Sequence, residues 1–389
     1  MSQTLVAAVP KDRVLVLFSG GDAPGMNPFL RAFARLGLNR HGAVVWGAKD
    51  GYRGLVRTSL RVEKEIEAVP LNNLRMRIAA QRGRAGLWER GLDLVELDHA
   101  SVSGLTGQGG IVLGAARCPE FLEPDVRQRV IKMLHELGIN AVVVCGGEGS
   151  LAGAERLAEE SNLLVVGVPA TIDNDVASTE IALGVDSAVN TLMWAVERFQ
   201  HTAGSHHRVM VLETMGRDCG ELARMSALAA GAEIVVTPER GRMSGDRLQR
   251  IGILLERSLL KGRSHAIVLV SEGVQTDGLM SQSPSQVLAE HLQRYFRRDE
   301  AALPETDVSV CVLGHLQRGG APSAADRILA ARFAEAAWDV IAANVPRSGT
   351  VGLQLGRVGW KPFGARMSNS TTDSPHQPLY ELQKAISEW

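Results

Sequence analysis

LLVVGVPATIDND, residues 163–175, decides the fold because it joins an apolar run to a polar turn. The run from Leu163 to Val168 predicts a fully buried strand of a parallel sheet. Two carboxylates, Asp173 and Asp175, follow it directly. In open α/β sheets, ligands bind at the carboxyl ends of strands. The turn therefore indicates a site where one carboxylate takes a proton and the other organises a cation or the loop, or else an ordinary Asx-rich turn.

Short apolar runs alternate with amphipathic stretches along most of the chain. The expected strands are Val14–Phe18, Val44–Gly47, Ala141–Cys145, Leu163–Val168, Val209–Glu213, Ala266–Val270 and Val308–Leu313. The expected helices cover 27–39, 128–137, 150–160, 185–200 and 324–342. This alternation predicts βαβ units and a mostly parallel, doubly wound α/β sheet. A chain of 389 residues has room for two such lobes.

Composition excludes several classes of protein. A net charge of -1 argues against a general nucleic-acid or acidic-membrane binder, and an aromatic content of 4% leaves little for base stacking. The four cysteines are far apart and form no CxxC pair, which predicts a reduced protein without a zinc site or disulfide framework. Neither a signal pattern nor a membrane-length apolar run is found, so we expect a cytoplasmic protein.

Two glycine-rich turns, Ser19–Asp22 and Gly146–Ser150, stand where a strand gives way to a helix. Backbone N–H groups and the helix dipole make such positions good phosphate sites. Glu148 would repel a bare phosphate, so we expect an intervening cation. Neither turn is a Walker A loop. One such turn alone would favour a simple tight connection, but two of them beside an acidic turn favour phosphate binding.

Basic residues recur near these strand ends, where arginine can clamp phosphate bidentately. Any one of them alone is more often a solvated surface residue, and it is their repetition that favours a phosphate site. They are Arg117, Arg208, Arg217, His315 and Arg318.

The chain resembles the phosphofructokinase family of sugar-phosphate kinases over about residues 14–333. The resemblance implies two Rossmann-like α/β lobes with mostly parallel sheets and an active site in the cleft between them. The N-terminal nucleotide-binding lobe would cover 1–185. The C-terminal sugar-phosphate lobe would cover 186–389, with the final helix packing back on the first lobe. The matching segments, in the family's order, are residues 20–27, 146–150, 169–175, 215–220 and 313–320 with 326–329.

The resemblance also implies a reaction, the transfer of the γ-phosphate of ATP to the 1-hydroxyl of fructose 6-phosphate in glycolysis, assisted by Mg²⁺. Asp173 would be the general base, with Thr171 and Asp175 supporting its loop and the metal. Arg117 and Arg217 would stabilise charge on the transferred phosphoryl group, the kind of help that this chemistry needs most.

The site residues carried over from the family fall into two sets. Those of the nucleotide site are Gly21, Arg117, Cys118, Gly147, Glu148, Gly149 and Ser150, with Glu148 also the metal ligand. Those of the sugar-phosphate site are Thr171, Asp173, Arg208, Met215, Gly216, Arg217, Glu272, His315 and Arg318.

Other family features concern assembly and regulation. Arg208 matches an arginine that a neighbouring subunit lends to the sugar phosphate, which implies a homodimer or homotetramer with shared active sites. His99 and Gln200 replace two arginines of the family's effector site, so either allosteric control by a nucleotide or phosphorylated metabolite, or simple interface salt bridges, are expected there. The matching effector positions are Arg31, Arg35, Glu233, Lys261 and Arg263.

Three departures from the family pattern bear on substrate choice. Glu148 stands where the family usually has Asp, and its extra methylene must shift the metal geometry or insert a water. Ser309 stands where bacterial members have the second lent arginine, and losing such a contact costs about ten- to a hundredfold in binding. The arginine-rich stretch 55–99 is longer than in short bacterial enzymes. It indicates a solvated surface insertion, a regulatory or assembly element, or a source of the missing phosphate contact.

Two positions distinguish the phosphoryl donor. Pyrophosphate-using members carry Asp and Lys where this chain has Gly149 and Ala170, so we expect ATP. Pyrophosphate, another ketose phosphate as acceptor, and a non-catalytic sugar-phosphate-binding regulatory subunit remain alternatives. An NAD(P)-dependent dehydrogenase is disfavoured, because the first turn lacks a spaced G-x-G-x-x-G.

Overall fold

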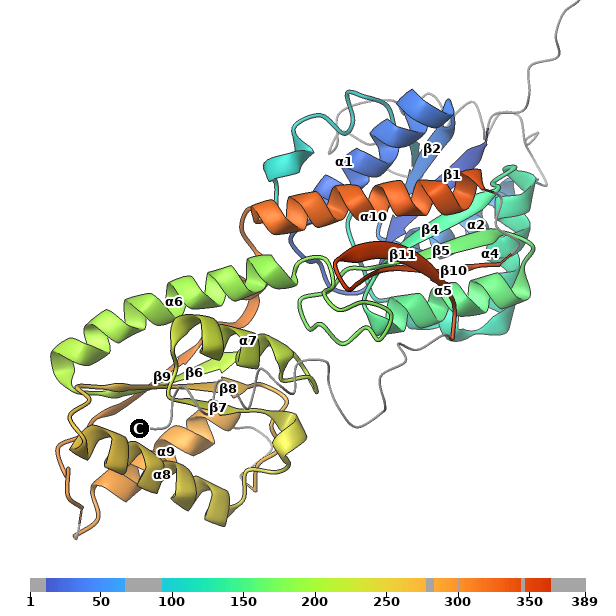
Figure 1. The fold of residues 1–389 in the computed structure, drawn as a ribbon. Helices are drawn as coiled ribbons and strands as arrows, with labels where there is room; N and C mark the ends of the chain where they lie inside the picture. Colours follow the sequence, from blue (N-terminus) through green and yellow to red (C-terminus); the bar gives the residue numbers. More distant parts are fainter. Residues whose placement is uncertain (1–11, 67–92, 278–282, 300, 344–346, 365–389) are drawn as a thin grey trace, which may run out of the picture. The chain divides into compact units, whose positions relative to one another are not determined.

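The computed structural model describes residues 12–66, 93–277, 283–299, 301–343 and 347–364 of the chain. These residues form two compact units (Figure 1). The first runs to Ala170 and resumes at Arg327, and the second comprises Thr171–Asp326. The boundary expected after residue 185 differs from this division. The chain leaves the first unit at Ala170, just after the strand expected at 163–168. It returns to that unit at Arg327, within the helix expected at 324–342.

The first unit is built on one seven-stranded sheet in the order β11-β10-β5-β4-β1-β2-β3. Strands β1, β2, β4, β5 and β10 are parallel, while β3 and β11 run antiparallel at the two edges. The strands are β1 (Arg13–Phe18), β2 (Val44–Ala48), β3 (Leu94–Glu96), β4 (Ala141–Gly146), β5 (Leu164–Pro169), β10 (Gly349–Gln354) and β11 (Arg357–Pro362). β2 and β4 lie on opposite sides of β1, so the loops after β1 and β4 flank a topological switch point, where ligands usually bind.

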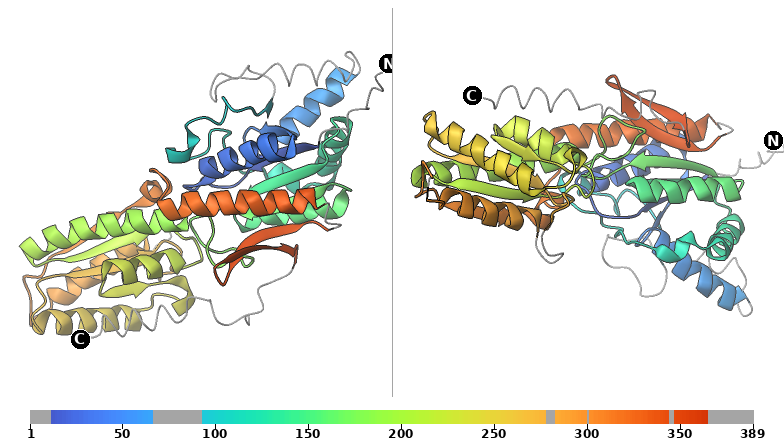
Figure 2. Two further views of the ribbon diagram at one scale, coloured as in Figure 1. Left: turned by 45° about the horizontal axis from the view of Figure 1, so that its top comes forward. Right: turned by 90° about the horizontal axis from the view of Figure 1, so that it is seen from below.

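Helices cover both faces of this sheet (Figure 2). On one face, α2, α4 and α5 pack on Leu15, Leu17, Val142 and Val144. On the other, Phe33 of α1 stacks on Trp338 of α10 with ring centroids 4.9 Å apart. The helices are α1 (Met26–Leu36), α2 (Tyr52–Ile66), α4 (Pro124–Glu136), α5 (Glu148–Glu160) and α10 (Ala324–Ala342), with the short segments η1 (Gly37–His41), η2 (Leu105–Gly107) and η3 (Pro119–Leu122).

The second unit carries a four-stranded parallel sheet in the order β7-β8-β6-β9. Helices α8 and α9 pack on one face and α6 and α7 on the other, because alternate residues of each strand point to opposite faces. The elements are α6 (Val185–His206), β6 (Val209–Thr214), α7 (Glu221–Ala230), β7 (Ile234–Val236), η4 (Pro238–Arg240), α8 (Gly245–Leu260), β8 (Ala266–Ser271), α9 (Pro284–Phe296), β9 (Val308–Val312) and η5 (Gly314–Arg318).

The seven strands expected from the sequence are all found, within one residue at each end. The α10 bounds match the expected 324–342, and α6 extends to His206, six residues beyond the expected end. Much of the insertion expected at 55–99 lies outside the described residues, including Arg75, Arg77, Arg82, Arg84 and Arg90. No helix in the described part of the chain has the length and apolarity needed to cross a membrane.

Candidate active site

The glycine-rich turns of the first unit pack against each other at the carboxyl edge of its sheet. Gly20 has φ +86°, and a Cβ added to it would lie 3.2 Å from the Ser150 hydroxyl. A Cβ on Gly146 would lie only 2.6 Å from the same hydroxyl and from the Ser19 carbonyl. Only glycine fits at Gly146, because real Cβ atoms do not approach other atoms so closely. The Ser19–Gly20 turn is thereby brought against the start of α5, whose bare backbone suits a phosphate.

The predicted nucleotide residues Arg117 and Cys118 lie on a loop beside the first turn. Ala116 forms a parallel bridge with Ser19, and Arg53 donates to the Arg117 carbonyl at 2.7 Å. The Arg117 side chain is exposed. Burial raises the pKa of the Cys118 thiol, which donates a hydrogen bond to Glu120 at 3.4 Å.

Glu148, the predicted metal ligand, is the first residue of α5 and is exposed. Across the described ranges of the chain, no three His, Cys, Asp or Glu side chains are grouped to hold a metal. One exposed carboxylate suits Mg²⁺, which takes one or two carboxylates and completes its shell with water and substrate phosphates. The residues present therefore fit a magnesium ion that arrives with a nucleotide rather than a resident one.

Asp173, the predicted general base, is 3% exposed in the second unit. The Arg217 Nε lies 3.7 Å from its Oδ2, and the Arg318 Nη2 lies 4.0 Å from its Oδ1. Thr171 accepts a hydrogen bond from the Asp173 N–H at 3.1 Å. The Asp173 Oδ1 is buried and makes no hydrogen bond among the described residues, so it is available to accept one from a substrate hydroxyl.

Burial raises the pKa of Asp173 above its ordinary value, and the charge of Asp175 adds to this effect. Arg318 and Arg217 act in the opposite direction. A carboxylate with a raised pKa is a better general base near neutral pH than an ordinary aspartate. The cluster therefore has the burial and charge expected of a proton acceptor beside an anion site.

The loop from Met215 to Gly220 carries Arg217, and side chains of neighbouring loops fix its backbone. Gln317 accepts from the Met215 N–H at 3.1 Å, and Glu272 accepts from the Arg217 N–H at 3.1 Å. A Cβ on Gly273 would lie 1.7 Å from the Arg217 carbonyl. Arg217 itself has φ +50°, which is uncommon outside glycine. These contacts set where the guanidinium of Arg217 points.

Three strands of the second sheet thus bring most of the predicted sugar-phosphate residues to one edge. Met215, Gly216 and Arg217 follow β6, Glu272 follows β8, and His315 and Arg318 follow β9. Arg318 is buried while His315 is exposed. Gln317, fully buried in the same segment, was missed as a site residue because a Gln inside a basic motif gave no signal of a structural role.

Arg208 is the exception, because it precedes β6 and so lies at the opposite, amino edge of the sheet. Its Nε is 3.6 Å from Asp307. Ser309 lies near it, since Ser309 pairs with Met210 in the β6–β9 register. The structure therefore separates Arg208 from Asp173 within the second unit, where it places Asp173 beside Arg217 and Arg318.

The predicted effector residues are divided between the two units. Arg31 and Arg35 lie one turn apart on α1 of the first unit. In the second unit, Glu233 forms an ion pair with Arg263, and Lys261 caps the end of α8. Burial raises the pKa of Glu233. The structure brings together one pair of this set, and the effector role stays a prediction.

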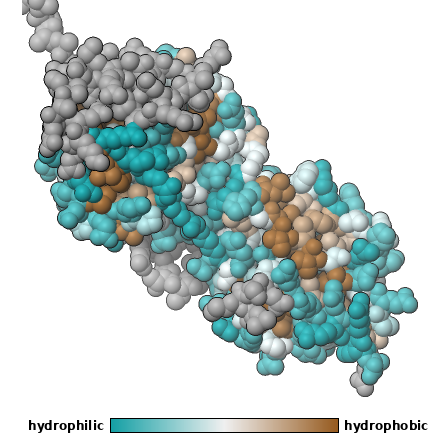
Figure 3. Space-filling model, turned by 180° about the vertical axis from the view of Figure 1, so that it is seen from behind, coloured by the Kyte–Doolittle hydropathy of each residue, from teal (hydrophilic) through white to brown (hydrophobic). Residues whose placement is uncertain are grey.

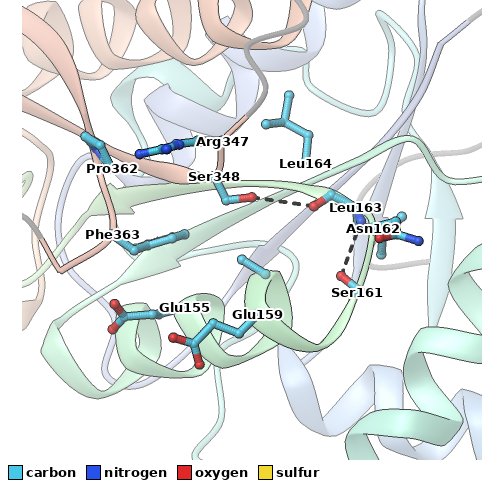
Figure 4. A pocket seen from close by; sticks show the side chains of 11 residues that line it. Glu155, Glu159, Ser161, Asn162, Leu163, Leu164, Arg347, Ser348, Pro362 and Phe363 are labelled. Carbon is cyan, nitrogen blue, oxygen red and sulfur yellow. Dashed lines mark hydrogen bonds between the residues drawn. The ribbon is translucent and has the colours of Figure 1, made fainter.

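An open pocket of about 610 Å³ lies elsewhere in the first unit (Figure 4). It is lined by the C-terminal half of α5, the start of β5 and the ends of the β10–β11 hairpin, including Glu159, Arg347 and Phe363. These residues belong to the amino side of β5. None of the predicted site residues lines this pocket.

Glycine turns at the switch point of one parallel sheet, with a buried carboxylate between arginines at the edge of a second, define an α/β protein that handles phosphorylated ligands. A phosphofructokinase family model matches residues 13–341. The chain belongs to the phosphofructokinase family.

Individual relatives agree with this assignment. The ATP-dependent 6-phosphofructokinase of Staphylococcus epidermidis is 35% identical over 376 residues, which cover 96% of this chain and 99% of the relative. That of Actinobacillus succinogenes is 38% identical over 321 residues, covering 82% of this chain and 83% of the relative. The crystal structure of Pichia pastoris phosphofructokinase superposes with a TM-score of 0.76 at 31% identity. It covers 92% of this chain but only 36% of that much longer chain.

Proposed function

We propose that this chain is an ATP-dependent 6-phosphofructokinase, which transfers the γ-phosphate of ATP to the 1-hydroxyl of fructose 6-phosphate. The observation that carries the proposal is Asp173, buried, with a raised pKa, and flanked by Arg217 and Arg318. Curated relatives matched over nearly their whole length carry the same activity in their names.

Asp173 accepts the proton of the 1-hydroxyl as that oxygen attacks the γ-phosphate, and Thr171 holds the backbone of its loop. Arg217 stabilises the negative charge that spreads over the transferred group, since phosphoryl transfer depends on positioning and electrostatics more than on covalent catalysis. Arg318, His315 and Glu272 orient the sugar phosphate.

The glycine turns of the first unit bind the phosphates of ATP through backbone N–H groups, with Arg117 supplying positive charge. Glu148 would hold Mg²⁺ together with the nucleotide, and the ion would supply positive charge against the phosphates. The proposal requires the turns of the first unit and the Asp173 cluster of the second to act on the same pair of substrates.

Two small residues support ATP over pyrophosphate as the donor. A Cβ added to Gly149 would have no atom within 4 Å, so the space beside it is open. Ala170 is fully buried, so a lysine there would have to displace its neighbours. Nothing charged occupies either position to oppose the α-phosphate of a nucleotide.

We further propose a cytoplasmic homodimer or homotetramer in which Arg208 reaches a neighbouring subunit's sugar phosphate. Arg208 lies at the sheet edge opposite Asp173, where it cannot serve the Asp173 cluster of its own unit. Large apolar side chains are exposed on the second unit, whose surface carries a hydrophobic patch in Figure 3. They include Trp194, Val310, Val312 and Leu316, which are 38–53% exposed.

The test is the initial rate with fructose 6-phosphate and Mg²⁺, measured with ATP and with pyrophosphate side by side. Turnover with ATP alone is expected. Turnover with pyrophosphate alone would show that Gly149 and Ala170 do not decide the donor. No turnover with either donor would contradict the proposed activity and favour another ketose phosphate as acceptor, or a regulatory subunit. The first variants to test would then be Ser309→Arg and Glu148→Asp, which introduce the family's residues.

A further inference from the structure

A network of charged side chains, formed by Glu221, Arg224 and Glu239, contacts the Met215–Gly220 loop that carries Arg217. Arg224 of α7 is 3% exposed, and its Nη2 donates to Glu221 at 2.6 Å and to Glu239 at 3.1 Å. Glu221 is also 3% exposed, whereas the Glu239 side chain is 37% exposed. Two carboxylates therefore share one guanidinium, and removing Arg224 would leave both without this cation.

Glu239 connects this network to the loop. Its Oε1, which Arg224 contacts, also accepts the Gly220 N–H at 2.7 Å. A Cβ on Gly220 would lie 2.7 Å from the Glu239 Oε2 and 2.4 Å from the Thr237 Cβ. Any residue larger than glycine would push Glu239 away, so the contact depends on close approach to bare backbone.

The Gly220 contact is the third anchor of one short loop. Gln317 holds the Met215 N–H and Glu272 holds the Arg217 N–H. Between these points the loop turns sharply, because Cys219 N–H bonds to the Gly216 carbonyl at 2.9 Å. Glu239 fixes the far end of that turn, three residues beyond Arg217, and thereby limits how far the guanidinium can move from Asp173.

We propose that Glu239, oriented by the buried Arg224, is a positioning residue for Arg217 and so for acceptor binding and phosphoryl transfer. The inference rests on the proposed function for its kinetic consequence, but the loop contact itself does not. Neither Glu239 nor Arg224 touches the substrate in the proposed mechanism. Their effect passes through the backbone of the Met215–Gly220 loop.

The first measurement is hydrogen–deuterium exchange of peptides spanning residues 215–220 in the full-length protein. Exchange should rise about tenfold or more in Glu239→Ala and about threefold in Glu239→Gln, because the amide oxygen of Gln still accepts the Gly220 N–H but lacks the charge. Asp277→Asn is the control, since Asp277 forms an exposed ion pair with Arg242 in the same unit, and it should leave this peptide unchanged. Unchanged exchange in Glu239→Ala, or in Glu239→Gln where the alanine variant does not fold, would overturn the proposal.

The second measurement separates positioning from general damage. In Glu239→Ala, kcat/KM for fructose 6-phosphate should fall about tenfold while KM for ATP stays within about twofold, and Glu239→Gln should recover most of the loss. An equal loss for both substrates would mean a merely structural role. If the wild type turns over no fructose 6-phosphate, the proposed function fails, and the exchange experiment alone then decides whether Glu239 holds the loop.

Discussion

The two units use different chemical groups at the carboxyl edges of their sheets. In the first unit, Gly20 and Gly146 let two turns pack closely and leave bare backbone at the starts of helices. In the second unit, charged side chains dominate, with Asp173 buried between Arg217 and Arg318. Both edges suit anions, but the second holds a buried carboxylate, Asp173, whose pKa is raised by burial.

This difference shows how the work of phosphoryl transfer can be divided. Backbone N–H groups bind phosphate oxygens at fixed positions and cannot change protonation state, so they suit the donor's phosphates. A side-chain carboxylate can be tuned by burial and by neighbouring charge, so it suits the acceptor's hydroxyl. Substitutions in the Asp173 cluster should therefore act on turnover, whereas those in the glycine turns of the first unit should matter when they add bulk or charge.

The largest effect is expected for Asp173→Asn, which keeps the shape of the side chain but removes the base. We expect kcat to fall by about 10²–10⁴-fold, with the affinity for fructose 6-phosphate little changed. Steady-state kinetics and calorimetric titration of the sugar phosphate measure the two quantities separately. Asp277→Asn, which alters an exposed carboxylate of the same unit, should keep kcat within about twofold.

Folding of the Asp173→Asn variant can be judged from the sign of the pKa shift. Burial raises the pKa of Asp173 in the folded state, so the charged carboxylate reduces stability progressively as the pH rises through that folded pKa. The neutral amide avoids this cost, and the thermal midpoint at neutral pH should stay the same or rise. Near-normal turnover in a stable variant would mean that another group is the base.

A smaller effect is expected in the first unit, where Gly149 allows a matched pair of substitutions. The space beside Gly149 is open, so Gly149→Asp should fold but place a negative charge near the donor's phosphates. We expect kcat/KM for ATP to fall by about ten- to a hundredfold. Gly149→Ala adds a methyl group without charge and should stay within about twofold. Equal kinetics for the two variants would show that the start of α5 does not hold the nucleotide.

The sequence predicted the seven strands well because buried parallel strands are short, continuous apolar runs bounded by glycine or polar turns. It did not predict β10 and β11, the hairpin that closes one edge of the first sheet. Gly349 and Gly352 interrupt the apolar pattern of β10, and β11 alternates exposed and half-buried residues. Residues from Arg327 onward belong to the first unit because of long-range packing, such as that of Trp338 on Phe33. A local sequence pattern cannot reveal such packing.

The residues of the candidate site could also be predicted only in part. Asp173, Arg217 and Arg318 were predicted from motifs, and the structure places the two guanidinium groups 3.7 and 4.0 Å from the Asp173 carboxylate. The anchors Gln317, Gly273 and Glu239 were not predicted, because each acts on the backbone of a loop distant in sequence. Such contacts depend on which strand ends lie close together in the folded sheet. The spacing of residues along the chain does not predict that arrangement.

The smallest effect, and the one that tests the charge balance around Asp173, is a shift in the pH profile. Activity requires the deprotonated base, so kcat/KM should rise with pH through the pKa of Asp173, at a pH above the usual value of about 4 for aspartate. Arg318 lowers that pKa. Arg318→Gln removes the cation, so the acid limb should move upward by about one pH unit, whatever the variant's loss of overall rate. Arg242→Gln, at an exposed ion pair of the same unit, should leave the limb in place. A limb that stays fixed in Arg318→Gln would show that the titrating group is not Asp173, and the proton acceptor would then have to be sought outside the second unit's arginine-flanked carboxylate.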